Sequence, residues 1–439
     1  MKIDMGAPRA QPTQPPRLAA RKASSLSMPV QGASSGPPGG VPPGAWRALG
    51  VLCVAVLLAM TTWFSASAVV PELTARWSLG PTAAAWLTIA VQLGFVTGAV
   101  TSAAFTLSDI VAPRRLVLLG ALGAAAANAG LLAAAGASAA IPLRFATGFF
   151  LAGVYPPAMK SMATWFRASR GTALGILVGA LTLGSAMPHL VKGLGGLDWR
   201  VVVVGTSLLT VAGGLLALTA GSEGPFPFPR AAFDPRALGR ALGDRGVRLA
   251  TLGYFGHMWE LYAMWAWFGV FYADVLARAG SDAPLRGAAF AAFGVIAAGA
   301  LGCGAAGALA DRWGRTRTAG AAMAVSGACC LVAGALQAPW LVLAVGLVWG
   351  FAVVADSAQF STMVTELADQ RYVGTALTAQ LAIGFTLTVA TIWLVPLVRE
   401  AAGWWWALAL LAPGPALGVV AMARLAASPD AARIAGGRG

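Results

Sequence analysis

Charged side chains are scarce in this chain. Its 439 residues include 30 Lys or Arg and 16 Asp or Glu, so charged residues are only 10% of the sequence, whereas a soluble domain carries about 25%. Apolar residues make up 58%. So few charges cannot cover the surface of soluble domains of this length. The composition therefore predicts an all-α integral membrane protein whose solvent is lipid.

Residues that build enzyme and metal sites are also few. There are two His and four Cys, and the Cys, all in apolar runs, have no spacing typical of a zinc site or a disulfide framework. None of the four Lys follows a Gly, so a phosphate-binding P-loop and an ATP-driven pump are excluded. We expect no enzymatic activity, no cofactor and no metal. The Cys are Cys53, Cys303, Cys329 and Cys330.

Apolar stretches of about 20 residues, long enough to cross a ~30 Å hydrocarbon core as helices, recur along the chain. They predict twelve transmembrane helices in two six-helix halves, 45–219 and 248–425, joined by a cytoplasmic linker rich in Pro and Arg, 220–247. Residues 1–44 are interpreted as a disordered cytoplasmic tail, in which Met1 or Met28 is the start, and 426–439 as a second tail. The expected spans are 47–70, 82–105, 114–135, 138–165, 171–194, 199–219, 248–273, 285–309, 318–337, 339–365, 373–398 and 403–424.

The two halves share short strings at nearly one offset. The string from Asp109 to Arg115 resembles that from Asp311 to Arg317, and Gly171-Thr-Ala-Leu recurs as Gly374-Thr-Ala-Leu. Such repetition predicts a six-helix repeat about an axis along the membrane normal. Repeated halves favour alternating access over an ion channel.

Basic residues collect on one side of the predicted topology. With the N-terminus inside, 22 of the 30 Lys and Arg fall in cytoplasmic segments and six in outside loops, so both termini are predicted to be cytoplasmic. This distribution also explains the net charge of +14 without a nucleic-acid partner. The Ala, Gly and Arg bias suggests a bacterium with a GC-rich genome. We expect a monomeric, multi-pass protein of the bacterial inner membrane.

The string from Gly307 to Arg317 is the most specific motif. It resembles the loop signature of the major facilitator superfamily, in which Gly, an Asp-Arg pair, a second Gly and basic residues cross a tight cytoplasmic turn. Gly314 suits a turn closed to residues with a Cβ, and Asp311 is expected to cap a helix or pair with arginines. In the first copy Ile110, Ala112 and Pro113 replace the expected Arg, Gly and its neighbour. The resemblance implies gating by Asp109, Arg114, Arg115, Gly307, Asp311, Arg312, Gly314 and Arg315.

Two further likenesses concern helices four and five. Gly175 and Gly179 have a spacing that allows close helix contact. Gly184-Ser-Ala-Met-Pro188 stands where the antiporter signature of drug exporters has a Gly-Pro pair, which weakens an efflux assignment.

Helices one, four and five also resemble the bacterial nitrate, nitrite and cyanate permease branch. The arginines of its nitrate transporters are missing from 82–105 and 287–309, so a different small anion is favoured.

Ionisable groups at membrane depth are costly and are candidate functional residues by default. The first half contributes cations, among them Arg144, Lys160 and Lys192, and the second half His257 with two carboxylates. His257 and Glu260 are three residues apart, so we expect them to lie on one helical face within reach of each other. The predicted substrate-binding residues are Arg144, Tyr155, His189, Tyr254, Tyr262 and Gln359, and the predicted proton-coupling residues are His257, Glu260 and Asp356.

Each of these residues also has a structural interpretation. The first-half cations can sit at the membrane interface or snorkel toward headgroups, His257 with Glu260 can be a structural pair, and Asp356 can cap a broken helix. Hydroxyls at Thr61, Thr62, Ser65 and Ser67 serve substrate binding or helix packing equally well.

The sequence thus predicts a secondary active transporter that takes up a small organic or inorganic anion with protons. Its partners are the substrate, protons and the lipid bilayer. Two alternatives stay open: an efflux pump for amphipathic compounds, which the aromatic seventh helix favours, and a non-transporting membrane sensor or assembly partner with the same fold.

Overall fold

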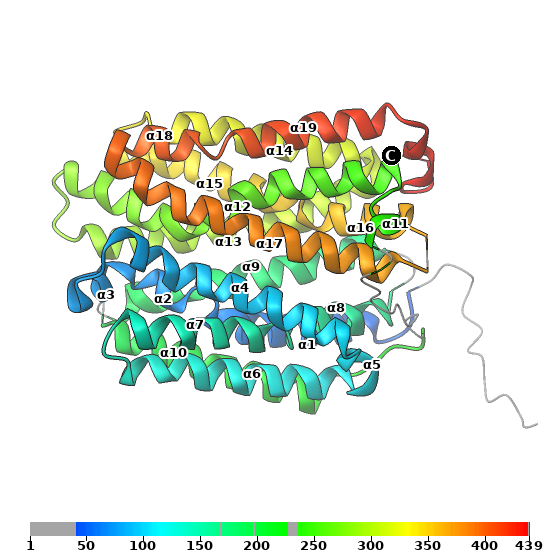
Figure 1. The fold of residues 1–439 in the computed structure, drawn as a ribbon, viewed down its shortest axis with the longest axis horizontal. Helices are drawn as coiled ribbons and strands as arrows, with labels where there is room; N and C mark the ends of the chain where they lie inside the picture. The colour runs from blue at the N-terminus through cyan, green and yellow to red at the C-terminus, as the bar shows by residue number, and fades with distance from the viewer. Residues whose placement is uncertain are drawn as a thin grey trace, which may run out of the picture. The chain divides into compact units, whose positions relative to one another are not determined.

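Long helices run back and forth through the computed structural model (Figure 1). The structure describes residues 41–166, 169–195, 198–226, 236, 238–369, 371–437 and 439, without the side chains of 108, 109, 238 and 241. Most of the predicted N-terminal tail and the linker residues 227–235 lie outside this description. Contacts divide the chain into Met1–Pro38 and Gly39–Gly439, and only the second unit is considered below.

The first six predicted spans are all helical, and two of them are broken. Span one is divided into four short helices and span four into two. The elements are α1 (Ala45–Ala59), η1 (Met60–Thr62), α2 (Ser65–Ala68), α3 (Val70–Trp77), α4 (Pro81–Ala104), α5 (Leu107–Ile110), α6 (Pro113–Ala129), η2 (Gly130–Ala133), α7 (Ala137–Leu151), α8 (Tyr155–Ala163), α9 (Arg170–Leu194) and α10 (Trp199–Ala220).

The second set of spans follows the same plan. Span ten is broken at Asp356 and span twelve before Pro413. The elements are α11 (Leu238–Ala241), α12 (Arg245–Arg278), α13 (Pro284–Trp313), α14 (Arg315–Ala333), α15 (Pro339–Ala355), α16 (Ser357–Leu367), α17 (Val373–Ala402), α18 (Trp404–Ala409), α19 (Pro413–Ala426) and η4 (Pro429–Arg433).

Eleven helices in the described part of the chain are long and apolar enough to cross a membrane. The predicted seventh span, α12, is not among them, although it has 34 residues. Its Gly, Trp and Tyr residues, together with His257 and Glu260, lower its hydropathy. Most of its side chains are buried against α13, α17 and α19 rather than exposed on the outside of the bundle. Contact with other helices, rather than with lipid, explains the polar composition of α12.

Helix starts follow from local sequence. Proline occupies the first turn of α4, α6, α13, α15 and α19, where its missing N–H costs no hydrogen bond and its φ suits a helix. Asp198 and Asp244 cap α10 and α12 through hydrogen bonds to backbone N–H groups. The short connections make neighbouring spans antiparallel. One end of the bundle therefore collects Arg115, Arg170 and Arg315, and we call it the basic end.

Glycine seams bring helices of the two halves into backbone contact. A Cβ on Gly175 of α9 would lie 2.7 Å from the carbonyl oxygen of Cys303 on α13, and one on Gly179 would lie 3.0 Å from that of Ala300. The predicted close contact of the Gly175 and Gly179 face is thus confirmed, and it joins the first half to the second. The other contact between the halves runs along α4 and α17.

Two glycines of α13 provide a test of this packing. A Cβ on Gly302 would lie 2.0 Å from the carbonyl oxygen of Phe351, whereas one on Gly304 would meet nothing within 4 Å. We expect Gly302→Ala to lower stability by about 1–3 kcal/mol through overpacking, and Gly304→Ala to leave it unchanged or raise it slightly. Melting temperatures of the two purified variants in detergent measure this. Equal melting temperatures would contradict the α13–α15 packing.

Candidate functional site

A cavity of about 640 Å³ lies between the two halves. It extends from aromatic rings in the middle of the bundle to the basic end, where Ser169, Arg170, Glu366 and Gly374 line it. Three of the predicted substrate-binding residues, Tyr155, Tyr254 and Tyr262, line this cavity, and so does His257. The sequence therefore located part of the cavity wall.

Aromatic rings from both halves close the inner end of the cavity. Trp63 stacks on Tyr262 with ring centroids 5.8 Å apart and lies 4.7 Å from Phe95. Phe385 of α17 lies 4.9 Å from Phe95 and 5.1 Å from Tyr262. These contacts cross from α4 and the break after η1 to α12 and α17. We call this set, completed by Phe64 and Trp265, the aromatic roof.

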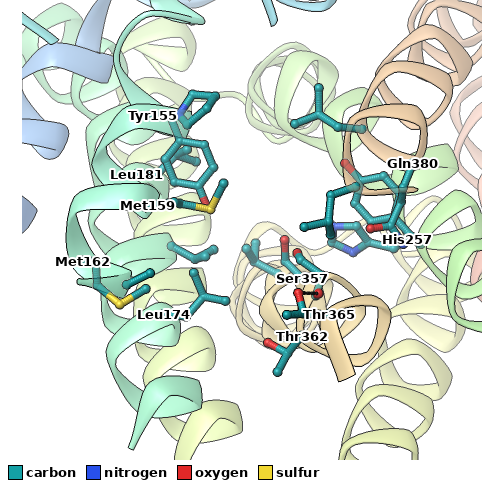
Figure 2. A pocket seen from close by; sticks show the side chains of 18 of the residues that line it. Tyr155, Met159, Met162, Leu174, Leu181, His257, Ser357, Thr362, Thr365 and Gln380 are labelled. Carbon is teal, nitrogen blue, oxygen red and sulfur yellow. Dashed lines mark hydrogen bonds between the residues drawn. The ribbon is translucent and has the colours of Figure 1, made fainter. Parts of the chain in front are cut away.

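The two walls below the roof differ in chemistry (Figure 2). On the first-half side Tyr155, Met159, Met162, Leu174 and Leu181 present a mainly apolar surface from α8 and α9. The facing wall is polar. It carries His257 of α12, Gln380 of α17, and the hydroxyls of Ser357, Ser361, Thr362 and Thr365 on α16.

Four side chains that line the cavity contain a buried nitrogen with no hydrogen-bond partner among the described residues. They are Trp63 Nε1, Trp265 Nε1, His257 Nε2 and Gln380 Nε2. A buried donor without a partner costs about 1–3 kcal/mol. Three of the four are N–H donors in every protonation state, so the cavity offers hydrogen bonds to acceptor atoms.

His257 of the cavity wall lies beside Asp356, which does not itself line the cavity. Nδ1 of His257 lies 2.8 Å from Oδ1 of Asp356, and both side chains are almost completely buried. The contact has the length of an ion pair, but the ring N–H does not align with the oxygen as in a good hydrogen bond. Asp356 stands at the break between α15 and α16 and makes no side-chain cap there. The structure thus joins two predicted proton-coupling residues from α12 and from that break.

Glu260 is not the partner of His257 that the sequence predicted. Its carboxylate accepts hydrogen bonds from Ser326 Oγ at 2.9 Å, Cys330 Sγ at 3.1 Å and Trp349 Nε1 at 2.5 Å. These donors belong to α14 and α15, so Glu260 faces the interior of the second half and does not line the cavity. A spacing of three residues places His257 and Glu260 on neighbouring positions of one helix. Their partners on other helices determine the direction in which each side chain points.

Arg144 also lies away from the cavity. Its guanidinium is completely buried and donates to Leu87 O at 3.2 Å, Thr62 O at 3.0 Å and Ser65 Oγ at 3.1 Å. It also donates to Asn128 Oδ1 and to the carbonyl of Trp63. The carbonyls of Thr62 and Trp63 are released where span one is broken. Arg144 therefore stabilises the break that positions the Trp63 ring in the roof.

Three further candidates also lie away from the cavity wall. Lys192, one of the first-half cations, lies in α9 and pairs with Glu72 Oε1 at 2.9 Å. His189 is buried beside Gly269 of α12 and does not line the cavity. The Oε1 atom of Gln359 accepts a hydrogen bond from Arg315 at 3.2 Å. The structure therefore does not bring these three to the cavity wall.

The hydroxyls of the first span are engaged in helix packing. Thr61 bonds to Thr210 and to the carbonyl of Thr206, and Ser67 bonds to Thr88 at 2.6 Å. Of the two interpretations left open by the sequence, these contacts favour packing.

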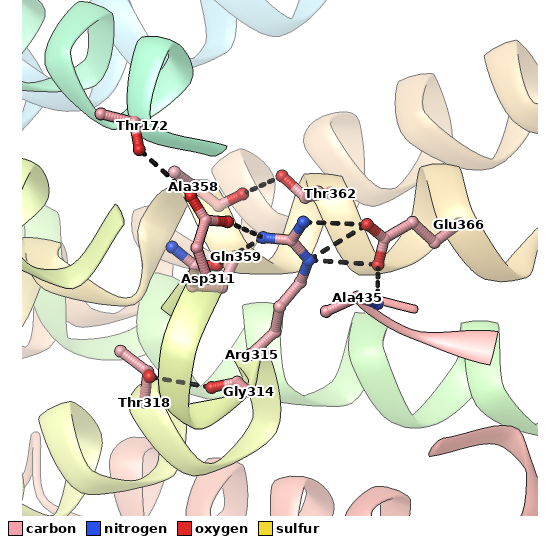
Figure 3. Close-up of polar contacts among 10 residues, drawn as sticks. All are labelled: Thr172, Asp311, Gly314, Arg315, Thr318, Ala358, Gln359, Thr362, Glu366 and Ala435. Atoms are coloured by element: carbon pink, nitrogen blue, oxygen red, sulfur yellow. Dashed lines mark hydrogen bonds and ion pairs between the residues drawn. The ribbon is translucent and has the colours of Figure 1, made fainter. Parts of the chain in front are cut away.

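Arg315 is the centre of a charged network at the mouth of the cavity (Figure 3). It donates Nη2 to Glu366 Oε1 at 2.9 Å and Nε to both carboxylate oxygens, and it lies 4.0 Å from Asp311. Asp311 in turn accepts a hydrogen bond from Thr172 of the first half at 3.1 Å. Asp311 lies in the last turn of α13 and does not cap α14. Its carboxylate lies instead at the first turn of α9, where Thr172 donates to it and a Cβ on Gly171 would lie 3.0 Å from its Oδ1. The structure thus places Asp311 both at a helix N-terminus and beside an arginine.

The remaining motif residues differ in how far the structure defines them. Gly314 has φ of +97°, as expected for a turn that excludes a Cβ. A Cβ on Gly307 would lie 3.2 Å from the carbonyl oxygen of Gly171 in the first half. Arg312 is exposed, as are Arg114 and Arg115 of the first copy. The side chain of Asp109 is outside the described residues.

Comparison with known proteins agrees with this architecture. The family model of the Major Facilitator Superfamily matches residues 52–380. The chain belongs to the major facilitator superfamily. No curated protein matches it by sequence. Among solved structures it is similar to a bacterial homolog of the human lysosomal transporter Spinster, in an inward-facing and unoccupied conformation, with TM-score 0.62, 15% identity, and coverage of 91% of this chain and 98% of that one.

Membership in this superfamily makes the protein a multi-pass secondary transporter of small molecules, not an enzyme. The comparisons give no support to the nitrate, nitrite and cyanate branch. Within the part of the chain that the structure describes, no three His, Cys, Asp or Glu side chains gather closely enough to hold a metal ion.

Several residues of the transporter's cavity had not been singled out from the sequence. Trp63, Phe95 and Phe385 belong to apolar runs in which nothing distinguishes a roof residue from a lipid-facing one. Gln380 and Glu366 did carry a signal, because a polar residue in or beside a membrane span is costly. Only the fold shows that Glu366 is the partner of Arg315.

We expect Arg144→Lys to lower the melting temperature strongly or to prevent folding. One ammonium cannot reach the carbonyls of Thr62, Trp63 and Leu87 together, and each buried carbonyl left unpaired costs about 1–3 kcal/mol. Size-exclusion chromatography of heated, detergent-solubilised protein measures this, with Arg200→Lys at an exposed position as the control. A variant that kept the wild-type melting temperature but lost substrate binding would show instead that Arg144 is a ligand.

Proposed function

We propose that this transporter couples the movement of protons to that of an organic anion with an apolar body. The observation that carries the proposal is the set of four unpartnered nitrogens in a cavity whose opposite wall is apolar. Donors without partners favour a substrate that brings acceptor atoms, such as a carboxylate or sulfonate.

The size and lining of the cavity favour an organic substrate over a small inorganic ion. The methionines and leucines of the first-half wall and the rings of the roof offer apolar contact, and apolar area removed from water contributes about 25 cal/mol per Å². An inorganic anion would leave this surface unused. An aromatic or branched apolar body would cover it while its acceptor group faced His257 and Gln380.

Cationic side chains at the mouth of the cavity favour the entry of an anion. They differ in part from the cations that the sequence suggested. Lys160 and Arg170 line the mouth from the first half, and Arg315 from the second. Arg144 and Lys192, which the sequence also favoured, do not line the cavity.

Proton coupling is assigned to His257 and Asp356. A proton on this pair gives the neighbouring cavity a more positive potential and favours an anion beside it. Proton and anion then move together, which is symport in the direction of the proton gradient. We further propose that the basic end faces the cytoplasm of a bacterium, because Lys and Arg gather there, so the direction is uptake.

The alternative with support in the structure is efflux of an amphipathic cation. The aromatic roof favours it, since a cation near a ring face gains about 0.5–2 kcal/mol. The missing Gly-Pro pair in α9 disfavours it. The sign of the substrate charge distinguishes the two.

Proteoliposomes containing a pH-sensitive dye test the proposal. Benzenesulfonate and naphthalenesulfonate are the anionic probes, because they stay ionised and cannot carry protons through lipid by themselves, and benzyltrimethylammonium is the cationic probe. We expect the sulfonates to drive a proton flux that Asp356→Asn abolishes. Glu260→Gln is the matched comparison, since that carboxylate is equally buried but bonds to Ser326, Cys330 and Trp349 rather than to His257 of the cavity wall, and it should keep the flux.

Three results would contradict the proposal. Flux with the cation alone would favour efflux. If Glu260→Gln abolishes the flux and Asp356→Asn does not, the residue that carries the proton is Glu260, inside the second half, rather than Asp356. If no probe drives a proton flux and cells nevertheless show substrate-dependent signalling, the non-transporting sensor is favoured.

A further inference from the structure

A second cavity, of about 500 Å³, lies on the outside of the second half at the basic end. It is a groove between the start of α14 and the end of α19, two helices that pack against each other along one edge of the bundle (Figure 1). We call it the α14–α19 groove. Its lining includes Trp313, Thr316, Arg317, Gly320, Val419 and Ala423.

The groove lies at the level where lipid headgroups meet the hydrocarbon core. The 19 residues of α14 form a helix about as long as the ~30 Å core is thick, so the first turn of α14 lies at one face of the bilayer. Trp313, the last residue of α13, is 60% exposed beside this turn, and exposed Trp is typical of a membrane interface. A lipid in the groove would therefore have its headgroup beside the first turn of α14.

The part of the groove that runs into the hydrocarbon core is apolar. A Cβ on Gly320 of α14 would lie 3.6 Å from Cβ of Met422 on α19, so the two helices approach closely at that point. Ala423 is exposed and gives the groove no more than a methyl group. Apart from Thr316, Arg317 and the indole N–H of Trp313, every lining residue is apolar. This surface suits an acyl chain and offers nothing to a hydrated ligand.

The headgroup end of the groove offers hydrogen-bond donors that lack acceptors. Arg317 is exposed and makes no ion pair with any residue that the structure describes. Thr316 is only 1% exposed, and its Oγ1 has no hydrogen-bond partner among the described residues. Gly314 gives α14 no side-chain cap, so the first N–H groups of this helix also lack acceptors within it. Phosphate oxygens accept hydrogen bonds from all three kinds of donor.

The charge of the lining distinguishes between lipid headgroups. Arg317 is charged, and none of the residues that line the groove is acidic. A zwitterionic headgroup would place its ammonium group where no carboxylate of the groove can receive it. A headgroup with a net negative charge has no such group, and both Arg317 and the positive end of the α14 dipole attract it.

We infer that the α14–α19 groove is a binding site for an anionic phospholipid, whose phosphate accepts from Arg317, Thr316 and the first turn of α14 while one acyl chain lies between α14 and α19. The site is separate from the substrate cavity, because no residue lines both. The inference requires neither the substrate nor the coupling ion assigned above.

Native mass spectrometry of the full-length protein in detergent tests this. Phosphatidylglycerol is the anionic probe, and phosphatidylcholine with the same acyl chains is the zwitterionic one. We expect the first phosphatidylglycerol to bind about tenfold more tightly than phosphatidylcholine, which is the effect of one hydrogen bond to a charged group. Arg317→Gln should abolish this preference.

Three further variants separate the groove from the rest of the surface. Arg424→Gln removes the same charge from the last turn of α19, at an exposed position outside the groove, and should keep the preference. Thr316→Val should weaken phosphatidylglycerol binding by about threefold without lowering the melting temperature of the lipid-free protein, because its hydroxyl has no partner to lose. Ala423→Phe fills the groove from an exposed position and should weaken binding of both lipids.

The preference in the parent and in Arg424→Gln, together with its loss in Arg317→Gln, supports the inference. Equal affinities of the two lipids in the parent would overturn it, as would a preference that survives both Arg317→Gln and Thr316→Val. Competition by inorganic phosphate, with no effect of Ala423→Phe, would assign the donors to a soluble anion instead of a lipid. A dimer that Ala423→Phe converts to a monomer would show that a second copy of the chain occupies the groove. Either result would overturn the inference.

Discussion

The requirement that every polar group in lipid finds a partner inside the protein is met most fully at Arg144. Its guanidinium donates hydrogen bonds to the carbonyls of Thr62 and Trp63 at the break in span one. It also donates to the carbonyl of Leu87 on α4 and to Asn128. Asn128 then reaches α10 through Val203 and Ser207. The break turns Trp63 toward the second half, so the roof of the cavity depends on a residue that does not touch the cavity.

Buried polar residues of this transporter differ in how fully their hydrogen-bonding capacity is met. Arg144, Glu260 and Lys192 have partners and connect helices within one half. His257 and Gln380 lie on the cavity wall and each has a nitrogen without a partner among the described residues. An unmet donor alone does not mark the cavity, because Gln92 and His189 also have one and do not line it.

Hydropathy predicted the helices to within a few residues at most ends, since span length is fixed by the thickness of the bilayer. It also marked the polar residues of α12, and the loop motif marked the Gly314 turn. Neither could show which helices supply the partners of those residues. Glu260 was assigned to His257 by spacing along one helix, but Trp349 and Ser326 come from spans whose positions only the fold defines. Roof residues such as Phe385 were invisible for the same reason.

The glycine seam between α9 and α13 has a consequence for how the two halves can move. Where backbone meets backbone, at Gly175 and Gly179, no side chain has to change rotamer when one helix rolls over the other. The rings of the aromatic roof interlock between the halves, so they must separate when the halves part on that side. The two contacts between the halves therefore differ in what a rocking movement requires of the side chains.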